Sequence, residues 1–432
     1  MNKASRQNTL RYCFGLTVLL FSLFSFVPHV NAAQVIERLA GADRYATAAA
    51  IAENGWPNGA QTAILAYGEN FPDALTAVPL AKKLNAPILL TETKQLTPVT
   101  QAALQSRSVR NVIIVGGTGV VSPEVEQQLR RLGLTTTRLA GADRYATAAA
   151  IAVYMGNESG KLIVTSGANF QAALIVSSYA GQQGIPILLA DNQSTADAVN
   201  YLRNQNIQKT YLVSIAGELS PALAAQFPNV TQIQGGDPID ANIQVLKKFA
   251  LNYTFDRVYL ATGNVFADAL AGGSPAAKDG APIVLLGATL DSRLADYLSE
   301  KGYDMHRFTI LGGEGALPST LVQGYAEQIS HDQDLRLTAI NGIAPIALDS
   351  TGSALTLQQW TPLPDQHQVA PEQSWTLTFS GELRRQLSDF SYVYLVKDNQ
   401  SVEATPSFSQ NTMTITPVQS YEPNANYMLV AV

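Results

Sequence analysis

Cysteine and histidine are scarce in this 432-residue chain, which has one cysteine and four histidines. Cys13 lies near the start of the apolar part of an N-terminal segment rather than at its end, so the sequence predicts no disulfide and no lipid attachment. His306, His331 and His367 lie far apart without metal-ligand spacing, and no Gly-x-Ser-x-Gly motif occurs. We therefore expect no metal, no cofactor and no cysteine or serine nucleophile.

Charged residues are also few, at 14% of the chain. Three of the 28 basic residues and none of the 34 acidic residues precede Ala33, so the chain from Ala33 onward has a net charge of −9. A nucleic-acid partner is not expected at that charge. After residue 32 no run reaches the ~18 apolar residues of a membrane span, so we expect no transmembrane anchor.

The first 32 residues have the pattern of a secretory signal peptide. Three basic residues precede the apolar stretch Tyr12–Val27, and Val30-Asn-Ala32 has the small residues that a signal peptidase accepts. We therefore assign residues 1–32 to a signal peptide, leave them out of the fold and expect a secreted protein.

What the chain does contain is internal repetition. The segment Arg38–Ala52, RLAGADRYATAAAIA, recurs unchanged at Arg138–Ala152. A third, degenerate copy opens with Gly235-Gly-Asp-Pro-Ile239, which keeps the aspartate but replaces the Arg-Tyr pair. The predicted repeats are residues 33–133, 134–230 and 231–330. Repetition multiplies a binding surface more often than it builds one catalytic centre.

Apolar strand-like runs alternate with amphipathic helical runs within the first repeat. The expected strands are residues 62–67, 87–90 and 112–115, and the expected helices are residues 72–84, 98–104 and 123–132. This alternation predicts parallel strands with crossover helices, and the continuously apolar strands predict burial on both faces. The fold class is therefore α/β, with each repeat a small doubly wound parallel-sheet unit. Thr97-Pro98 and Ser122-Pro123 each place a capping hydroxyl before a proline at a helix start.

Beyond about residue 330 the helical period disappears, and His331–Asp334 is the expected hinge. Short strands are expected at Ser374–Phe379, Tyr392–Val396, Thr412–Thr416 and Tyr427–Val432. Their length and spacing predict an all-β sandwich over residues 331–432.

The most specific candidate site is Gly41-Ala-Asp43-Arg44-Tyr45, between an extended segment and a helix. Asp43 is the expected N-cap, and in the bland interpretation Tyr45 only packs. Arg44 is not explained by packing alone, because a cation in the first helical turn opposes the helix dipole and needs a compensating anion. Its compensating anion is either a carboxylate of a neighbouring repeat or a ligand.

A second candidate is the Gly68-Glu69-Asn70 loop, which follows a buried strand at the carboxyl end of the predicted sheet. Ligands usually bind at that end of open α/β sheets, and free amide groups there can hold an anion. The nearby Asp73 corresponds to Ala172 and Asp268 in the other copies, so one shared chemical role is weakened. Asp73 or Asp268 can instead answer an Arg44-type guanidinium across a repeat interface.

Glycine-rich turns follow two further strands, at Gly116-Gly-Thr-Gly119 and Gly312-Gly-Glu-Gly315. Their spacing differs from G-x-G-x-x-G, so a tight strand-to-helix turn is favoured over phosphate binding.

Taken together, the repeated RLAGADRY segment, the Gly-x-Asn-Phe loop, the Pro87-Ile-Leu-Leu90 strand and the Gly116-Gly117 turn resemble the type 2 cell wall binding repeat of Gram-positive surface proteins. The resemblance covers roughly residues 35–329. It implies a pseudo-threefold assembly of three repeats that anchors the protein noncovalently to an anionic secondary polymer of the wall. The segment after residue 330 resembles bacterial Ig-like domains, which implies a spacer or display module.

The residues that we expect to bind the polymer lie in the repeated segments. These are Arg38, Asp43, Arg44, Tyr45, Asn70, Arg138, Asp143, Arg144, Tyr145 and Asn169, and the arginines are the best candidates because an acidic protein needs local positive charge to hold an acidic polymer. The Leu317-Pro-Ser-Thr320 string has no hydrophobic tail after it, so retention at the cell surface is expected to be noncovalent.

Two alternatives remain open at this stage. One is an auxiliary factor whose repeats target or stimulate a wall hydrolase, and a surface-layer protein is a further possible partner. The other is a carbohydrate-active enzyme that uses acidic residues at the repeat junctions. Our expectation is a binding protein, not an enzyme.

Overall fold

A computed structural model describes residues 35–70, 74, 76–192, 195–299, 301, 305–331, 337–340, 374–379, 393–397, 400–402, 404–409, 412–420 and 427–431. Residues 35–331 form three four-stranded parallel sheets with the same strand order. The first is β3 (Ile88–Thr91), β2 (Thr62–Tyr67), β4 (Asn111–Val115) and β5 (Thr135–Leu139). The second is β7 (Ile187–Ala190), β6 (Lys161–Ser166), β8 (Lys209–Ile215) and β9 (Val230–Gly235). The third is β11 (Ile283–Leu286), β10 (Arg257–Thr262), β12 (Arg307–Leu311) and β1 (Val35–Leu39).

The fourth strand of every sheet comes from the start of the next repeat. Strands β5 and β9, which open the second and third repeats, join the first and second sheets. The ring closes through β1, which pairs in parallel with β12 of the last repeat, from Val35 opposite Arg307 to Leu39 opposite Leu311. No sheet is therefore completed by one repeat alone.

Twelve α-helices are described between residues 44 and 331. They are α2 (Arg44–Gly55), α3 (Val78–Lys83), α4 (Pro98–Ser106), α5 (Pro123–Arg131), α6 (Arg144–Met155), α7 (Gln171–Gln183), α8 (Ala196–Arg203), α9 (Pro221–Ala224), α10 (Pro238–Lys248), α11 (Ala267–Asp279), α12 (Ser292–Ser299) and α13 (Ser319–His331).

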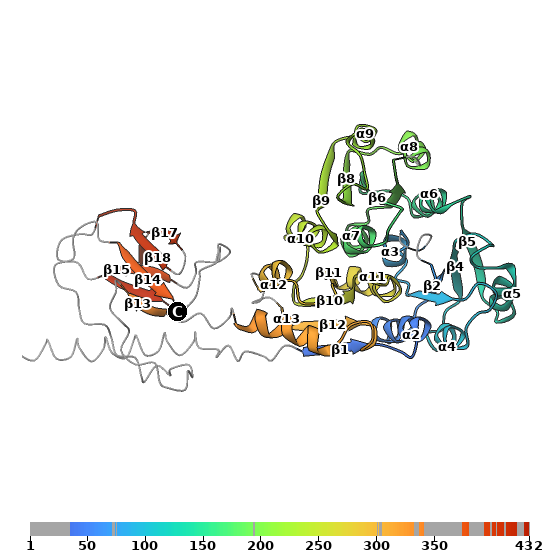
Figure 1. The fold of residues 1–432 in the computed structure, drawn as a ribbon, viewed down its shortest axis with the longest axis horizontal. Coiled ribbons are helices and arrows are strands. Elements are labelled where there is room, and N and C mark those ends of the chain that lie inside the picture. Colours follow the sequence, from blue (N-terminus) through green and yellow to red (C-terminus); the bar gives the residue numbers. More distant parts are fainter. Residues whose placement is uncertain are drawn as a thin grey trace, which may run out of the picture.

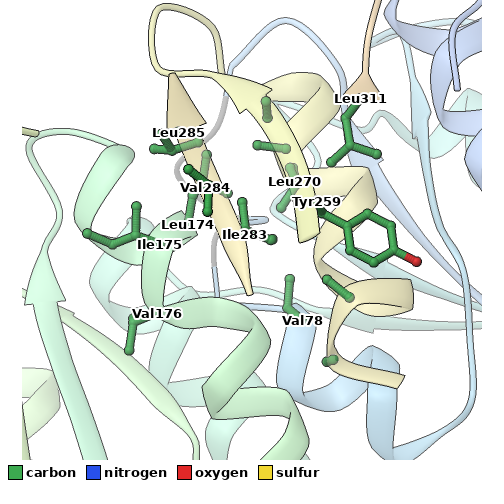
Figure 2. Close-up of a cluster of buried hydrophobic side chains, with 14 of the residues drawn as sticks. Val78, Leu174, Ile175, Val176, Tyr259, Leu270, Ile283, Val284, Leu285 and Leu311 are labelled. Carbon is green, nitrogen blue, oxygen red and sulfur yellow. The ribbon is translucent and has the colours of Figure 1, made fainter. Parts of the chain in front are cut away.

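Helices α3, α7 and α11 pack against one another in the middle, and the three sheets surround them (Figure 1). Small residues let these helices approach closely: a Cβ at Gly273 of α11 would lie 2.5 Å from Val78 of α3. Val78, Leu174 and Leu270, one from each helix, lie in one buried cluster with Ile283 of β11 (Figure 2). This pseudo-threefold centre gives the repeats a common core.

Strands such as β2 and β3 are buried on both faces, as their apolar sequences predict, whereas the fourth strands β1, β5 and β9 keep exposed positions. In β2, Ile64 and Ala66 face the central core, whereas Ala63 and Leu65 face a separate outer core beneath α4 and α5. Neighbouring side chains of a strand point to opposite faces, so each sheet contributes to two cores.

The predicted elements of the first repeat are confirmed with small shifts in their ends, and helix α3 is the largest difference. It begins at Val78 rather than at residue 72, with Pro79 in its first turn, where a missing N–H leaves no helical hydrogen bond unmade. Thr97 caps α4 by accepting from the amide of Thr100, as predicted. Ser122 holds the corresponding position before α5, but its hydroxyl makes no capping hydrogen bond, so that part of the prediction is wrong.

The described residues after 336 form two antiparallel sheets, as predicted for a β-sandwich. One contains β13 (Leu337–Ile340), β14 (Trp375–Phe379), β18 (Thr412–Pro417) and β17 (Ala404–Ser409); the other contains β16 (Gln400–Val402), β15 (Val393–Lys397) and β19 (Tyr427–Ala431). The expected hinge begins at His331, which is the last residue of α13, and its remaining residues lie outside the described ones. Across the described chain, no helix combines the length and the apolar character that a membrane crossing requires.

Candidate functional site

The first helix of each repeat begins beside the carboxyl ends of that repeat's sheet, where the chain has just crossed over from the preceding sheet. We call these places site 1 (the start of α2 and the loop after β2), site 2 (the start of α6 and the loop after β6) and site 3 (the start of α10 and the loop after β10). The strand order reverses between β2 and β4 in the first sheet, which is where open α/β sheets usually bind ligands.

In site 1, Asp43 is the N-cap of α2, as predicted, and accepts a hydrogen bond from the amide of Ala46 at 2.8 Å. Arg44 is exposed and donates from Nη1 to the carbonyl of Gly68 at 2.8 Å. Tyr45 is buried, with its ring against the backbone of Gly68. Burial raises the pKa of Tyr45 to about 12, and the negative charge of Glu69 adds to the effect. Among the described residues the hydroxyl of Tyr45 has no hydrogen-bond partner.

Site 2 repeats this arrangement. Asp143 accepts from the amides of Tyr145 and Ala146, both at 2.9 Å, and Arg144 donates to the carbonyl of Gly167 at 2.5 Å. The hydroxyl of Tyr145 donates to the carboxylate of Asp191, which follows β7. Burial, followed by this hydrogen bond, raises the pKa of Tyr145 to about 12. The recurring Arg-Tyr pair therefore has one recurring geometry: the ring covers a glycine and the guanidinium holds that glycine's carbonyl.

Site 3 keeps only the cap. Asp237 accepts from the amide of Asp240 at 2.8 Å, while Pro238 and Ile239 replace the Arg-Tyr pair. Its carboxylate also binds Arg293 of α12 at 2.9 Å, and Arg293 binds Asp291 at 2.7 Å. Hydrogen bonding to Arg293 lowers the pKa of Asp237 below its usual range. An arginine from a different helix thus supplies the positive charge at this site.

Arg38 and Arg138 lie away from sites 1 and 2, on β1 and β5. Arg138 donates to the carbonyl of Gly116 at 2.8 Å and binds Glu126 at 2.9 Å. Arg38 makes the equivalent bonds to the carbonyl of Gly312 at 2.8 Å and to Glu314 at 3.0 Å. The side chain of Arg138 is 17% exposed and that of Arg38 is 21% exposed. These contacts tie each opening strand to the glycine turn of the preceding repeat. Polymer binding by these two arginines stays a prediction.

Asp268 at the start of α11 lies across the interface from Arg44. Its side chain is 8% exposed, burial raises the pKa of its carboxyl group, and the charge of Arg44 lowers it. The charges of Asp268 and Arg44 therefore interact across the interface between the third and first repeats, as the sequence suggested. Asp73, its counterpart in the first repeat, lies outside the described residues.

The loop amides are engaged in the structure. The N–H groups of Gly68, Gly167 and Gly263 donate to the carbonyls of Thr91, Ala190 and Leu286, so the anion-holding role suggested for free amides does not apply to these three. Asn70 is exposed, whereas the side-chain oxygen of Asn169 is buried without a partner among the described residues.

The glycine-rich turns are strand-to-helix turns, as favoured from the sequence. Gly116 and Gly312 adopt φ of 107° and 102°, which only glycine adopts readily. Their carbonyls accept from Arg138 and Arg38, so the turns present oxygen atoms to arginine. No group of three or more histidine, cysteine, aspartate or glutamate side chains suited to a metal occurs in the described part of the chain.

Sequence reasoning missed three acidic or basic partners in this region. Glu126, Asp191 and Arg293 each bind a residue of the repeated segments. An acidic residue, Glu92, stands at the position of Asp191 in the first repeat, so the repeat comparison held a signal for that one. Glu126 and Arg293 have no counterpart of the same charge in the other repeats.

Comparison with known proteins gives two family matches. The model of a family described as cell wall binding domain 2 matches residues 38–126, 138–222 and 232–322. The model of a bacterial Ig-like domain matches residues 351–431. Both cover the residues on which the sequence resemblances rest.

Two curated relatives come from Bacillus subtilis (strain 168). The N-acetylmuramoyl-L-alanine amidase LytC is 33% identical over 308 residues, which cover 71% of this chain and 61% of the relative. The amidase enhancer is 32% identical over 255 residues, covering 58% of this chain and 35% of the relative. This chain therefore spans less than two thirds of the length of either.

Two solved structures from Clostridium difficile share the fold. Cwp6 superposes with a TM-score of 0.63 at 27% identity, covering 69% of this chain and 48% of that protein. Cwp8 superposes with a TM-score of 0.62 at 26% identity, covering 68% and 52%.

Proposed function

This chain belongs to the cell wall binding domain 2 family, and we propose that it is a secreted protein whose repeats bind an anionic secondary polymer of a Gram-positive cell wall. Family membership makes it a cell-wall-binding protein of the cell surface. The polymer, the noncovalent mode of retention and the secretion by way of residues 1–32 are parts of the proposal. The Ig-like domain is the module displayed by this anchor.

One observation carries the proposal: an arginine in the first turn of a helix, exposed at Arg44 and half-buried at Arg144, that donates to a neutral carbonyl. Arg44 is held at Nη1 by Gly68, and Arg144 is held in the same way by Gly167. The carbonyl orients the guanidinium of Arg44 without cancelling its charge, and the carboxyl group across the interface, Asp268, has a pKa that burial raises, which disfavours its charged form. The helix N-terminus adds positive potential, so an anionic group that reaches Arg44 meets both.

Acidic side chains limit how the polymer approaches site 1. Glu69 and Glu92 both raise the pKa of Tyr45, so both carboxylates lie near its ring. A phosphate or carboxylate of the polymer is therefore proposed to meet Arg44 on the side away from these groups. Such a contact weakens as salt concentration rises, because exposed charges are screened.

The test is sedimentation of the chain from Ala33 onward with isolated Gram-positive walls, before and after secondary polymers are stripped. The proposal expects binding that is lost on stripping and weakened by salt. Unchanged binding to stripped walls would contradict it and identify peptidoglycan as the target. Binding abolished by a chelator would replace direct arginine contact with a bridging cation.

A matched pair of double variants locates the contact. Arg44→Ala with Arg144→Ala removes two positive charges from sites 1 and 2. Arg110→Ala with Arg131→Ala removes two positive charges from the opposite end of the first sheet, where both side chains are exposed. We expect only the first pair to reduce wall binding, by tenfold or more. Equal losses in the two pairs would mean that net charge, and not these sites, governs binding.

A second candidate function is favoured by the relatives. One of them is named an amidase enhancer and another is an amidase, so the repeats of this chain can serve as an accessory to a wall hydrolase. The test is digestion of walls by a purified N-acetylmuramoyl-L-alanine amidase with and without this protein. Faster digestion that requires wall binding would support the accessory role, and an unchanged rate would remove it.

A further inference from the structure

Site 3 contains a hollow of about 270 Å³ at the carboxyl ends of β10 and β11. Ile239, Gly263 and Leu286 line it together with Gln171, Asn264 and Arg293. Gln171 comes from α7 of the preceding repeat and donates from Nε2 to the carbonyl of Gly263 at 3.2 Å. Two repeats therefore build the wall of this hollow.

The hollow occupies the place that a tyrosine ring fills in the other two sites. A Cβ at Gly68 would lie 2.5 Å from the ring of Tyr45, and one at Gly167 would lie 2.6 Å from the ring of Tyr145. A Cβ at Gly263 would lie 3.5 Å from the carbonyl oxygen of Leu286, and no ring atom of a described residue lies within 4 Å of it. The residue that replaces the tyrosine, Ile239, is itself a lining residue. The shorter side chain leaves the space of a six-membered ring open.

The charge around the hollow also differs from that of the other sites. Pro238 replaces the arginine, and Gly287 stands where Glu92 and Asp191 follow the equivalent strands. Among the described residues that line the hollow, Arg293 is the basic one, and it is bound between two carboxylates, at 2.9 Å from Asp237 and 2.7 Å from Asp291. One guanidinium with two carboxylates has a net charge of −1, which disfavours an anionic ligand.

We propose that site 3 binds one uncharged pyranose ring of a wall glycan, an inference that rests on the proposed wall-binding function. Ile239, which is half-buried, supplies apolar surface for a ring face, and the buried Leu285 and Leu286 form the layer beneath it. Gln171 and Asn264 supply side-chain amides at the rim, and the carboxylate of Asp237, which already accepts from Asp240 and Arg293, has further lone pairs for sugar hydroxyls. An aromatic ring has a similar size, but it carries too few hydroxyls for these rim groups and would leave them desolvated.

The proposal divides recognition between the sites. Sites 1 and 2 meet the charged groups of a polymer through Arg44 and Arg144, and site 3 meets a neutral sugar. The divergence of the third repeat is then a change of ligand chemistry and not a loss of function.

The test is saturation-transfer NMR on the chain from Ala33 onward with methyl N-acetyl-β-glucosaminide and methyl α-glucoside as probes. Glucose 6-phosphate is the anionic comparison and p-cresol the aromatic one. We expect a neutral glycoside to bind better than both. Preference for the phosphate or for p-cresol, or no binding of any probe, would overturn the proposal.

Three variants assign the signal to site 3. Ile239→Tyr fills the hollow with the ring that the other repeats have, and should weaken glycoside binding tenfold or more. Leu251→Tyr adds the same side chain at a fully exposed position and should leave binding unchanged. Gln171→Ala removes a rim amide without adding volume, so it tests the site even if Ile239→Tyr does not fold. Glycoside binding that survives both Ile239→Tyr and Gln171→Ala would place the sugar elsewhere and refute the proposal.

The result is separable from that of the wall-binding test. Wall sedimentation without glycoside binding would reject the site 3 proposal and leave the proposed function intact. Glycoside binding without wall sedimentation would reject the proposed function and leave site 3 as a sugar site.

Discussion

Replacing Gly68 by alanine tests the packing that defines sites 1 and 2. The added Cβ would lie 2.5 Å from Cε1 of Tyr45, whereas carbon atoms in contact normally lie about 3.5–4.0 Å apart. The ring must therefore move by roughly 1 Å or more, away from a position in which it is 9% exposed. The backbone of Gly68 is not in the left-handed region, so this steric conflict is the main cost.

The change in the free energy of unfolding on Gly68→Ala follows from two opposing effects. Overpacking of a buried site costs about 1–3 kcal/mol, and alanine in place of glycine restores about 0.4–1 kcal/mol by restricting the unfolded chain. Gly263→Ala is the matched control, because its Cβ would meet only ordinary contacts from 3.5 Å upward. The unfolded-state effect is common to both variants, so Gly68→Ala should be less stable than Gly263→Ala by about 1–3 kcal/mol.

The assay is equilibrium unfolding in urea, followed by the fluorescence of Trp56, which is 2% exposed at the end of α2. Tyr45→Ile gives site 1 the residue of site 3 and should remove most of the penalty of Gly68→Ala in a double-mutant cycle. Equal stability of Gly68→Ala and Gly263→Ala, or purely additive effects of Gly68→Ala and Tyr45→Ile, would refute the packing argument.

Three further predictions concern the contacts between repeats. Arg138→Ala should destabilise the fold by about 1–3 kcal/mol in urea unfolding, because it removes charged hydrogen bonds to Glu126 and Gly116; the exposed Arg131→Ala should change little. Burial raises the pKa of Glu126, but the hydrogen bond and charge of Arg138 outweigh burial, so the net pKa lies below the usual 4.5. The stabilisation is therefore present above that pH and lost as pH falls through the folded-state pKa, so Arg138→Ala should cost less at low pH than at neutral pH. Asp268 should behave in the opposite way, because its raised pKa means that its contribution to stability is lost as pH rises above about 3.8. The stability of Asp268→Asn relative to the native chain should therefore be higher at pH 7 than in acid. The reverse trend in pH-dependent unfolding would contradict this assignment. Deleting residues 33–39 removes β1 and leaves β12 an unpaired edge, which should cost at least the ~2–5 kcal/mol of losing buried Leu39 and produce self-association in size-exclusion chromatography.

Local sequence predicted the elements well, because their signals lie within each segment. The run at residues 62–67 is apolar throughout because both faces of β2 are buried, and it forms a strand over those same residues. Asp43 and Asp143 cap helices because a short acceptor side chain satisfies amides two or three residues away. Alternation and turns predicted β14, β15, β18 and β19 of the C-terminal sheets, but not β13, β16 and β17.

The roles of the repeated arginines could not be predicted in the same way. Arg38 and Arg44 belong to one repeated segment, and polymer binding was the expected role of both. In the structure, Arg38 reaches Gly312, which is 274 residues away, whereas Arg44 reaches Gly68 within its own repeat. Periodicity indicates which side of an element is buried, but not which distant segment covers it.

The sequence by itself determined the repeats, the α/β class, the helix caps and the family, because identical segments and local patterns encode them directly. Only the tertiary structure decided that β1 completes the last sheet and that Asp268 faces Arg44. It also decided that replacing a tyrosine by Ile239 leaves a hollow. These features depend on packing between residues far apart in the chain, where the space left by one side chain is set by all of its neighbours.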